Sequence, residues 1–239
     1  MKQAVIVTGA SKGLGKALSE IYQNADLYLF SRSPISTSAT LQKSIDLSKI
    51  DEIEPCFTPL FNDLKLKAYT EIILIHNAAM IEPIGFSGKQ DHTTLINSLN
   101  VGFTAVLLIT NLFINHFQPE QLEKKIFIIS SGAAINAYPG WSHYCAAKAG
   151  INMFAETVFK EQEDQSFPIQ IATFRPGVID TGMQESIRKQ PKEMFPIVEK
   201  FKSLRKDNLL RSPESVAKVI HSILKKPLEK CAYNINEFD

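Results

Sequence analysis

The sequence has few of the residues that build metal sites or disulfide frameworks. Only three of its 239 residues are cysteines, and Cys56, Cys145 and Cys231 form no CxxC pair. The five histidines form no HxxxH or HxxH pair. Such sparse cysteines indicate reduced thiols in a reducing compartment, and the histidine spacing gives no sign of a metal site.

An excess of charge of one sign is also lacking. Lysine and arginine total 26 against 25 acidic residues, whereas nucleic-acid or membrane-surface binding needs a basic excess or patch. No signal peptide and no apolar run of about 18 residues that would span a bilayer is recognised. We therefore expect a cytoplasmic protein with no nucleic-acid or membrane partner. A GxSxG elbow is absent as well, which argues against a hydrolase.

What the sequence does have is a regular alternation of short apolar runs and helix-length segments. Strands are predicted at 4–8, 27–31, 71–76, 125–130 and 169–174, with weaker candidates at 41–46 and 231–235. Helices are predicted at 13–23, 49–63, 92–117, 142–162 and 213–225. Runs of Ile, Val and Phe without polar alternation indicate strands covered on both faces. We predict one α/β domain over 1–239, a Rossmann-like doubly wound parallel sheet of about seven strands with helices on both faces.

Residues 182–212 interrupt this alternation as one long irregular piece. Long inserts in compact domains are often lids or binding loops, so a substrate lid is predicted here, with a surface excursion as the alternative. Met183, Ile187, Phe195 and Phe201 could give the insert an apolar inner face that suits a bulky hydrophobic ketone. Packing against the domain explains them equally well. Trp141 is likewise either the wall of an aromatic pocket or a core anchor.

A glycine-rich turn, TGASKGLG, follows the first predicted strand at residues 8–15 and contains Gly9, Gly13 and Gly15. Glycines let the backbone turn sharply and approach a pyrophosphate closely, and the free N–H groups of the next helix attract its charge. Between the first strand and first helix of a βαβ pattern, this turn predicts a dinucleotide site.

The end of the second predicted strand predicts which dinucleotide is bound. An NAD site usually has Asp or Glu there to hold the ribose 2′-hydroxyl, but this chain has Ser31 and Arg32. Arginine binds a 2′-phosphate, and Lys12 adds a second positive charge, so NADP(H) is predicted. Ordinary surface charges are the alternative. Asp46, after the third strand, is expected to meet the adenine edge or to cap the next helix.

Tyr144 and Lys148 are four residues apart in the predicted helix 142–162, so they share one face. An ammonium group beside a phenol lowers the phenol's pKa, which would let Tyr144 act as a general acid or base. Ser131, at the end of a predicted strand, could hydrogen-bond a substrate carbonyl oxygen. Each residue alone is more often a packing or turn residue, but their joint placement predicts a catalytic site.

Together these motifs resemble the short-chain dehydrogenase/reductase family over essentially the whole chain. The family's TGxxxGxG pattern stands as residues 8–15, its YxxxK pair as Tyr144 and Lys148, and its serine as Ser131. Its asparagine stands as Asn100, and its proline-glycine turn followed by threonine as residues 176–181. One motif departs from the family's type, because residues 76–79 read HNAA where NNAG is frequent.

The resemblance implies a division of labour. Tyr144 would donate a proton to a carbonyl oxygen, Lys148 would lower its pKa and bind the nicotinamide ribose, and Ser131 would hold the substrate. Asn100 would support a water-linked proton path to Lys148. The expected cofactor contacts are Gly9, Ser11, Lys12, Gly13, Leu14, Gly15, Arg32, Asp46, Asn77, Ala78, Tyr144, Lys148, Pro176, Gly177, Val178 and Thr181.

Within the family, the sequence around Tyr144 and Thr181 is similar to sepiapterin reductases and bacterial benzil reductases. This implies NADPH-dependent reduction of a small-molecule ketone or α-diketone. The alternatives are a pteridine side-chain reductase, an NADP-dependent alcohol dehydrogenase and, from another class, a non-catalytic NADP(H)-sensing protein. The resemblance also implies a homodimer or homotetramer.

Overall fold

Seven strands form one parallel sheet in the order β3-β2-β1-β4-β5-β6-β7 in the computed structural model, which describes residues 2–238. The strands are β1 Gln3–Thr8, β2 Asp26–Ser31, β3 Leu41–Ser44, β4 Glu71–His76, β5 Glu123–Ile129, β6 Gln170–Arg175 and β7 Ala232–Asn234. All seven predicted strands are confirmed. The strand order reverses between β1 and β4, and in such sheets ligands bind at that point, outside the carboxyl ends of the strands.

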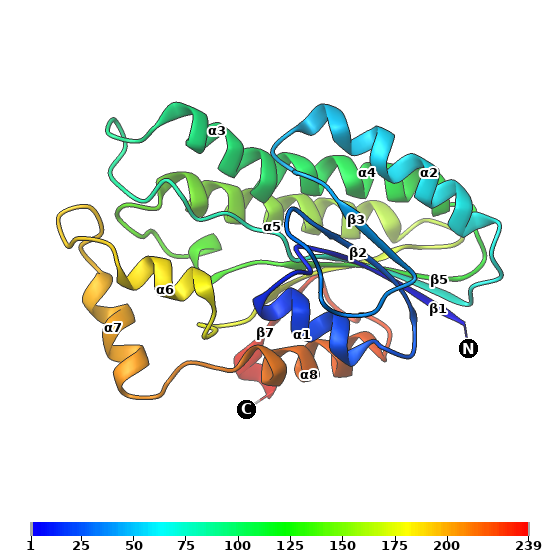
Figure 1. Ribbon diagram of the computed structural model, residues 1–239. Coiled ribbons are helices and arrows are strands. Elements are labelled where there is room, and N and C mark those ends of the chain that lie inside the picture. Colours follow the sequence, from blue (N-terminus) through cyan, green and yellow to red (C-terminus); the bar gives the residue numbers. More distant parts are fainter. Residues whose placement is uncertain (1, 239) are drawn as a thin grey trace.

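Helices cover both faces of the sheet (Figure 1). On one face lie α2 Ile53–Lys65, α3 His92–Leu99, α4 Ala105–Phe117 and α5 Ser142–Gln162, and on the other lie α1 Gly13–Ile21 and α8 Pro213–Leu224. Alternate residues of one strand enter different cores: Ala4 and Ile6 pack under α2 and α4, whereas Val5 and Val7 pack under α1 and α8. Both faces are thus apolar, which is why the strand sequences are continuously hydrophobic.

The predicted helix 92–117 is helical throughout but is not a regular α-helix. A π-helical segment, Asn100–Thr104, separates α3 from α4, and the Ala105 N–H donates to the Asn100 carbonyl. Such π segments are frequent at functional sites. By length and composition, His92–Phe117 could span a membrane, with a mean hydropathy of 1.5 over its most apolar stretch. The sequence-based statement that no such run exists is therefore wrong. A single helix of this kind is weak evidence for a membrane span, because core helices pass the same test and α4 contributes to the core.

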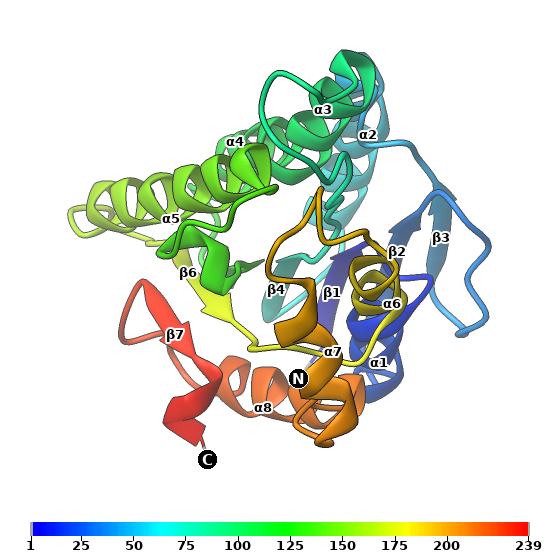
Figure 2. The ribbon, with the colours of Figure 1, turned by 90° about the vertical axis from the view of Figure 1, so that its left-hand side faces the viewer.

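The insert 182–212 was predicted to be irregular, and this prediction is wrong. The insert holds two short helices, α6 Gly182–Arg188 and α7 Val198–Lys206. They lie at the carboxyl end of the sheet, as the view in Figure 2 shows. Apolar side chains of the insert join Trp141 and Tyr144 in a third core cluster, which includes Ile187 of α6, Phe201 of α7 and Phe195 between the two helices. The insert thus has the predicted apolar inner face. The role of the insert as a substrate lid stays a prediction.

Candidate active site

A cleft of about 550 Å³ opens at the carboxyl end of the sheet, and residues of the insert form part of its lining. It brings together most residues predicted for the site: Gly9, Ser11, Lys12, Gly13, Leu14, Arg32, Asp46, Asn77, Ala78, Ser131, Tyr144, Lys148, Pro176, Gly177, Val178 and Thr181 line it. Two predicted site residues, Gly15 and Asn100, do not belong to the cleft lining within residues 2–238. These segments are far apart in the sequence and meet only because parallel strands end at one edge.

The glycine turn between β1 and α1 is held in a compact shape. Gly9 has a φ of +69°, and a Cβ there would lie 2.8 Å from the Ala78 Cα; a Cβ at Gly15 would lie 2.1 Å from the Gly9 carbonyl oxygen. The Asn77 amide donates to the Thr8 and Gly9 carbonyls at 3.1 and 3.0 Å. Gly15 therefore shapes the turn from behind instead of lining the cleft.

The first turn of α1 suits an anion. Its N-cap residue, Lys12, makes no side-chain capping hydrogen bond within the described chain, and the first two helical residues, Gly13 and Leu14, line the cleft. Open N–H groups at a helix start, beside close-packed glycines, match the needs of a pyrophosphate. The residues present therefore fit a dinucleotide.

The cleft wall beyond β2 has an arginine, and no acidic residue, directly after the strand. Ser31, Arg32 and Ser33 line it in sequence. Asp46 also lines it, and its carboxylate accepts hydrogen bonds from the N–H and Oγ of Ser48 at 3.1 and 2.9 Å. Burial raises the pKa of Asp46, but these bonds and nearby cations lower it more, so the net shift is downward. The alternative that Asp46 caps the next helix is wrong, because Lys49 is the N-cap there.

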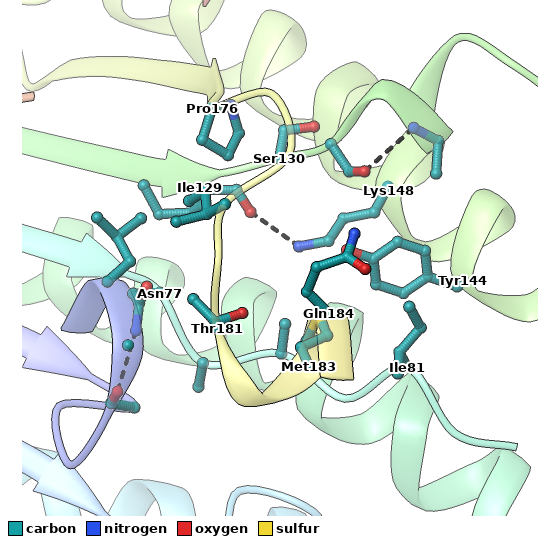
Figure 3. A pocket seen from close by; sticks show the side chains of 18 of the residues that line it. Asn77, Ile81, Ile129, Ser130, Tyr144, Lys148, Pro176, Thr181, Met183 and Gln184 are labelled. Carbon is teal, nitrogen blue, oxygen red and sulfur yellow. Dashed lines mark hydrogen bonds between the residues drawn. The ribbon is translucent and has the colours of Figure 1, made fainter. Parts of the chain in front are cut away.

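Tyr144 and Lys148 lie one turn apart on α5, and both side chains enter the cleft (Figure 3). Their exposed fractions are 8% and 2%. The Lys148 Nζ donates to the Ile129 carbonyl at 2.8 Å and lies 5.7 Å from the centre of the Tyr144 ring. The hydrogen bond to the end of β5 thus holds the position of the Lys148 ammonium group, and α5 holds Tyr144 beside it.

The expected lowering of the Tyr144 pKa is wrong for this structure. Burial raises the pKa of Tyr144 to about 12, although a hydrogen bond with Ser131 acts in the opposite direction. Burial also lowers the pKa of Lys148 to about 8. Loss of hydration penalises the charged form of each group, and for Tyr144 it outweighs the opposite effect of the hydrogen bond with Ser131.

Two adjacent serines follow β5, and their surroundings separate their roles. The Ser130 Oγ donates to the Asn152 side chain at 2.7 Å, which commits its proton. The Ser131 Oγ accepts from the Ala133 N–H at 3.1 Å, lines the cleft and bonds with Tyr144. Ser131, as predicted from the sequence, is thus placed to meet a substrate oxygen.

Asn100 is placed differently from the expectation. Its side-chain amide donates to the Ser48 carbonyl at 2.9 Å, so it ties the helix to the segment before α2. The side chain is outside the described cleft lining, and its contribution to a proton path stays a prediction.

The family model for short chain dehydrogenases matches residues 3–192. The chain belongs to the short-chain dehydrogenase/reductase family. It is 38% identical to a benzil reductase ((S)-benzoin forming) of Bacillus subtilis, over 98% of both chains. It is 24% identical to the sepiapterin reductase of Mus musculus, over 98% of this chain and 96% of that one. The KRED1-Pglu enzyme has the same fold, with a TM-score of 0.81, 23% identity, and coverage of 97% of this chain and 100% of that one.

These matches confirm the resemblance to sepiapterin and benzil reductases that the motifs indicate. They also show that the protein is an oxidoreductase. The family uses nicotinamide cofactors, in agreement with the glycine turn and the open start of α1. The 38% identity, spread over nearly the whole chain, supports carbonyl reductase activity.

The reductase has an apolar wall beside Tyr144. Trp141 stacks on Phe195 with ring centres 4.6 Å apart and meets Tyr144 edge-on at 5.7 Å. Trp141 is only 4% exposed yet lines the cleft, so it is both core anchor and pocket wall. From the insert, Met183, Ile187 and Phe201 line the cleft, whereas Phe195 is fully buried behind Trp141.

Sequence reasoning missed Gln184 and Tyr138, which also line the cleft. Tyr138 packs edge-on against Trp141. Gln184 is buried in the first turns of α6, and the figure shows its side chain reaching in beside Met183 (Figure 3). The signal for Gln184 in the sequence is its place after Thr181, in the stretch that resembles sepiapterin and benzil reductases, and that resemblance assigns it no role. Its burial depends on how the insert folds, which the local pattern does not reveal.

His76, where this family often has asparagine, is buried at the end of β4. It is 3% exposed, and its Nε2 lies 3.0 Å from the Thr110 Oγ1. Burial, with a smaller effect of the Lys148 charge, lowers the pKa of His76 to about 3. The histidine is therefore neutral at physiological pH, and it fills the position without disturbing the Asn77 bonds to the glycine turn.

His76 predicts a loss of stability in mild acid. Between pH 6.5 and 3, the unfolded state binds a proton that the folded state does not, so stability falls as pH falls. At pH 5 the cost is about 2 kcal/mol for an unfolded pKa of about 6.5. The free energy of unfolding is measured with urea at pH 7.5 and at pH 5. Between these two pH values, His76→Asn should lose about 2 kcal/mol less of this free energy than the parent does. The exposed His92→Asn is the control, and parallel losses in all three proteins would contradict the account.

Proposed function

We propose that this protein is an NADPH-dependent carbonyl reductase that reduces benzil-type α-diketones, with Tyr144 as the proton donor. The observation that carries the proposal is one cleft that combines the glycine turn, Arg32, the Ser131–Tyr144–Lys148 group and an apolar wall. The 38% identity to a benzil reductase supports the substrate class.

Bound NADPH would supply the hydride that reaches the carbonyl carbon, since no side chain can supply one. The turn 9–15 would hold the pyrophosphate, and Lys12 and Arg32 the 2′-phosphate. Lys148 would bind the nicotinamide ribose, and the segment 176–181 would pack against the nicotinamide. All these segments line the cleft.

The protonation state of Tyr144 at neutral pH suits a proton donor. A general acid must hold its proton before it acts, and a pKa of about 12 keeps the phenol protonated at neutral pH. An alkoxide is a much stronger base than a phenolate, so proton transfer to the reduced oxygen remains favourable. Lys148, with a pKa of about 8, is mostly charged at pH 7 and would stabilise the phenolate left behind. Alcohol oxidation would instead need the phenolate beforehand.

The apolar wall favours a hydrophobic substrate. Trp141, Met183, Ile187 and Phe201 present aromatic and aliphatic surface to the space beside Tyr144. Phenyl rings gain free energy when they leave water for such surroundings, at about 25 cal/mol per Å² of apolar area buried. Ser131 would donate to the reacting oxygen and stabilise its developing charge.

The test is a cofactor assay. Loss of NADPH absorbance is followed with benzil, with other ketones and α-diketones, and with sepiapterin, over several enzyme concentrations. We expect the highest kcat/KM with benzil-type diketones. Preference for sepiapterin would indicate a pteridine side-chain reductase, and NADPH binding without turnover on any compound would indicate a cofactor-sensing protein. The homodimer or homotetramer and the cytoplasmic location stay predictions.

A further inference from the structure

Gln184 places an uncommitted hydrogen-bond donor in the cleft. Its side chain is 2% exposed and lines the same cleft as Ser131 and Tyr144. Its Nε2 has no hydrogen-bond partner among residues 2–238. Figure 3 shows its amide and the Tyr144 ring entering the same space from different segments.

The orientation of this amide is set by its neighbour on α6. The Arg188 Nη1 donates to the Gln184 Oε1 at 3.2 Å. Arginine has only donors, so the amide oxygen must face it and the NH₂ group must point away. The unpaired atom is therefore a donor, and it suits an acceptor such as a carbonyl oxygen.

Buried polar groups are nearly always paired, and an unpaired one calls for an explanation. Gln184 has apolar neighbours in the lining, Met183 and Ile187, so a simple packing role would be served better by leucine or methionine. A reacting carbonyl oxygen already has two donors, the hydroxyls of Ser131 and Tyr144. A third donor is surplus for a simple ketone, but it matches the second oxygen of an α-dicarbonyl compound.

We propose that the Gln184 Nε2 donates a hydrogen bond to the non-reacting carbonyl oxygen of an α-dicarbonyl substrate, which makes Gln184 a specificity-determining residue. This rests on the proposed function and assigns recognition of the second oxygen to the insert. Arg188 acts as its positioning residue by holding the amide oxygen.

The experiment compares Gln184→Glu and Gln184→Leu with the parent. Glutamate has nearly the same shape and keeps the Arg188 partner, but it replaces the donor by an acceptor. Gln190→Glu is the matched control, because it makes the same change on the same segment outside the described cleft lining. Three quantities are measured: kcat/KM for benzil, the Kd of NADPH, and the inhibition constant of deoxybenzoin, in which a methylene replaces the second carbonyl of benzil.

Both Gln184 variants should lower kcat/KM for benzil by roughly 10- to 100-fold, the range for a buried hydrogen bond lost near a transition state. For Gln184→Leu, the deoxybenzoin inhibition constant should stay unchanged, as should the NADPH Kd of both variants. Full benzil activity in Gln184→Glu would overturn the proposal and indicate an anchor for Arg188. The proposal would also be overturned if Gln184→Leu raised the deoxybenzoin inhibition constant by the same factor by which it lowered kcat/KM for benzil. An increase of the NADPH Kd in either variant would overturn it as well. A parent enzyme that binds NADPH but does not reduce benzil would overturn the proposed function, and this assignment with it.

Discussion

Tyr144→Phe is expected to lower kcat/KM for benzil by roughly 10²- to 10⁴-fold, the usual contribution of a general acid. The variant loses only the hydroxyl, so the ring keeps its contacts with Trp141 and the fold is retained. The NADPH Kd, measured by fluorescence quenching, should change by less than about threefold, because the loss concerns proton transfer and not ground-state binding.

Tyr138→Phe is the matched control, since it removes a phenol hydroxyl from the same cleft. It should retain activity close to that of the parent. If Tyr144→Phe kept activity within tenfold of the parent, below the range for a general acid, or if Tyr138→Phe lost as much, Tyr144 would not be the proton donor.

Arg32→Asp is expected to reverse or erase the preference for NADPH over NADH. The change removes a charge-assisted hydrogen bond, worth about 1.5–3 kcal/mol, and places a carboxylate near the 2′-phosphate. The ratio of kcat/KM for NADPH to that for NADH should therefore fall by at least about 100-fold, with most of the loss in NADPH.

The exposed Lys218→Asp on α8 makes the same charge change away from the cleft and is the control. Because a long-range charge effect is screened by salt, the comparison is made at 0.15 M ionic strength. An unchanged NADPH to NADH ratio in Arg32→Asp would remove Arg32 from cofactor selection.

The sheet could be predicted because its signals are local. Strands buried on both faces, such as β1 and β4, have uninterrupted apolar sequences, and the start of α8 is marked by Ser212 as N-cap and a proline in the first turn. The edge strand β3 gave a weaker signal because all four of its residues are exposed. The helices of the insert have no such local signal, because α6 and α7 are short and are stabilised by packing on Trp141.

The site residues could be placed from motif spacing, but their electrostatics could not. Sequence spacing places Lys148 beside Tyr144 and predicts a lowered pKa for the Tyr144 phenol. Burial depends on the three-dimensional packing around both residues, and it reversed the direction. The same limitation hid Gln184, whose unpaired amide becomes visible only once α6 is folded over the cleft.

The central claim is that hydride from NADPH and a proton from Tyr144 are delivered to one carbonyl of a diketone in this cleft. It is tested most directly by reducing benzil with NADPH that carries two deuterium atoms at nicotinamide C4 and analysing the product by mass spectrometry. The account predicts benzoin with one deuterium on its carbinol carbon from the parent, and little benzoin from Tyr144→Phe. Benzoin without deuterium, or equal labelled product from the parent and Tyr144→Phe in the same time, would contradict it.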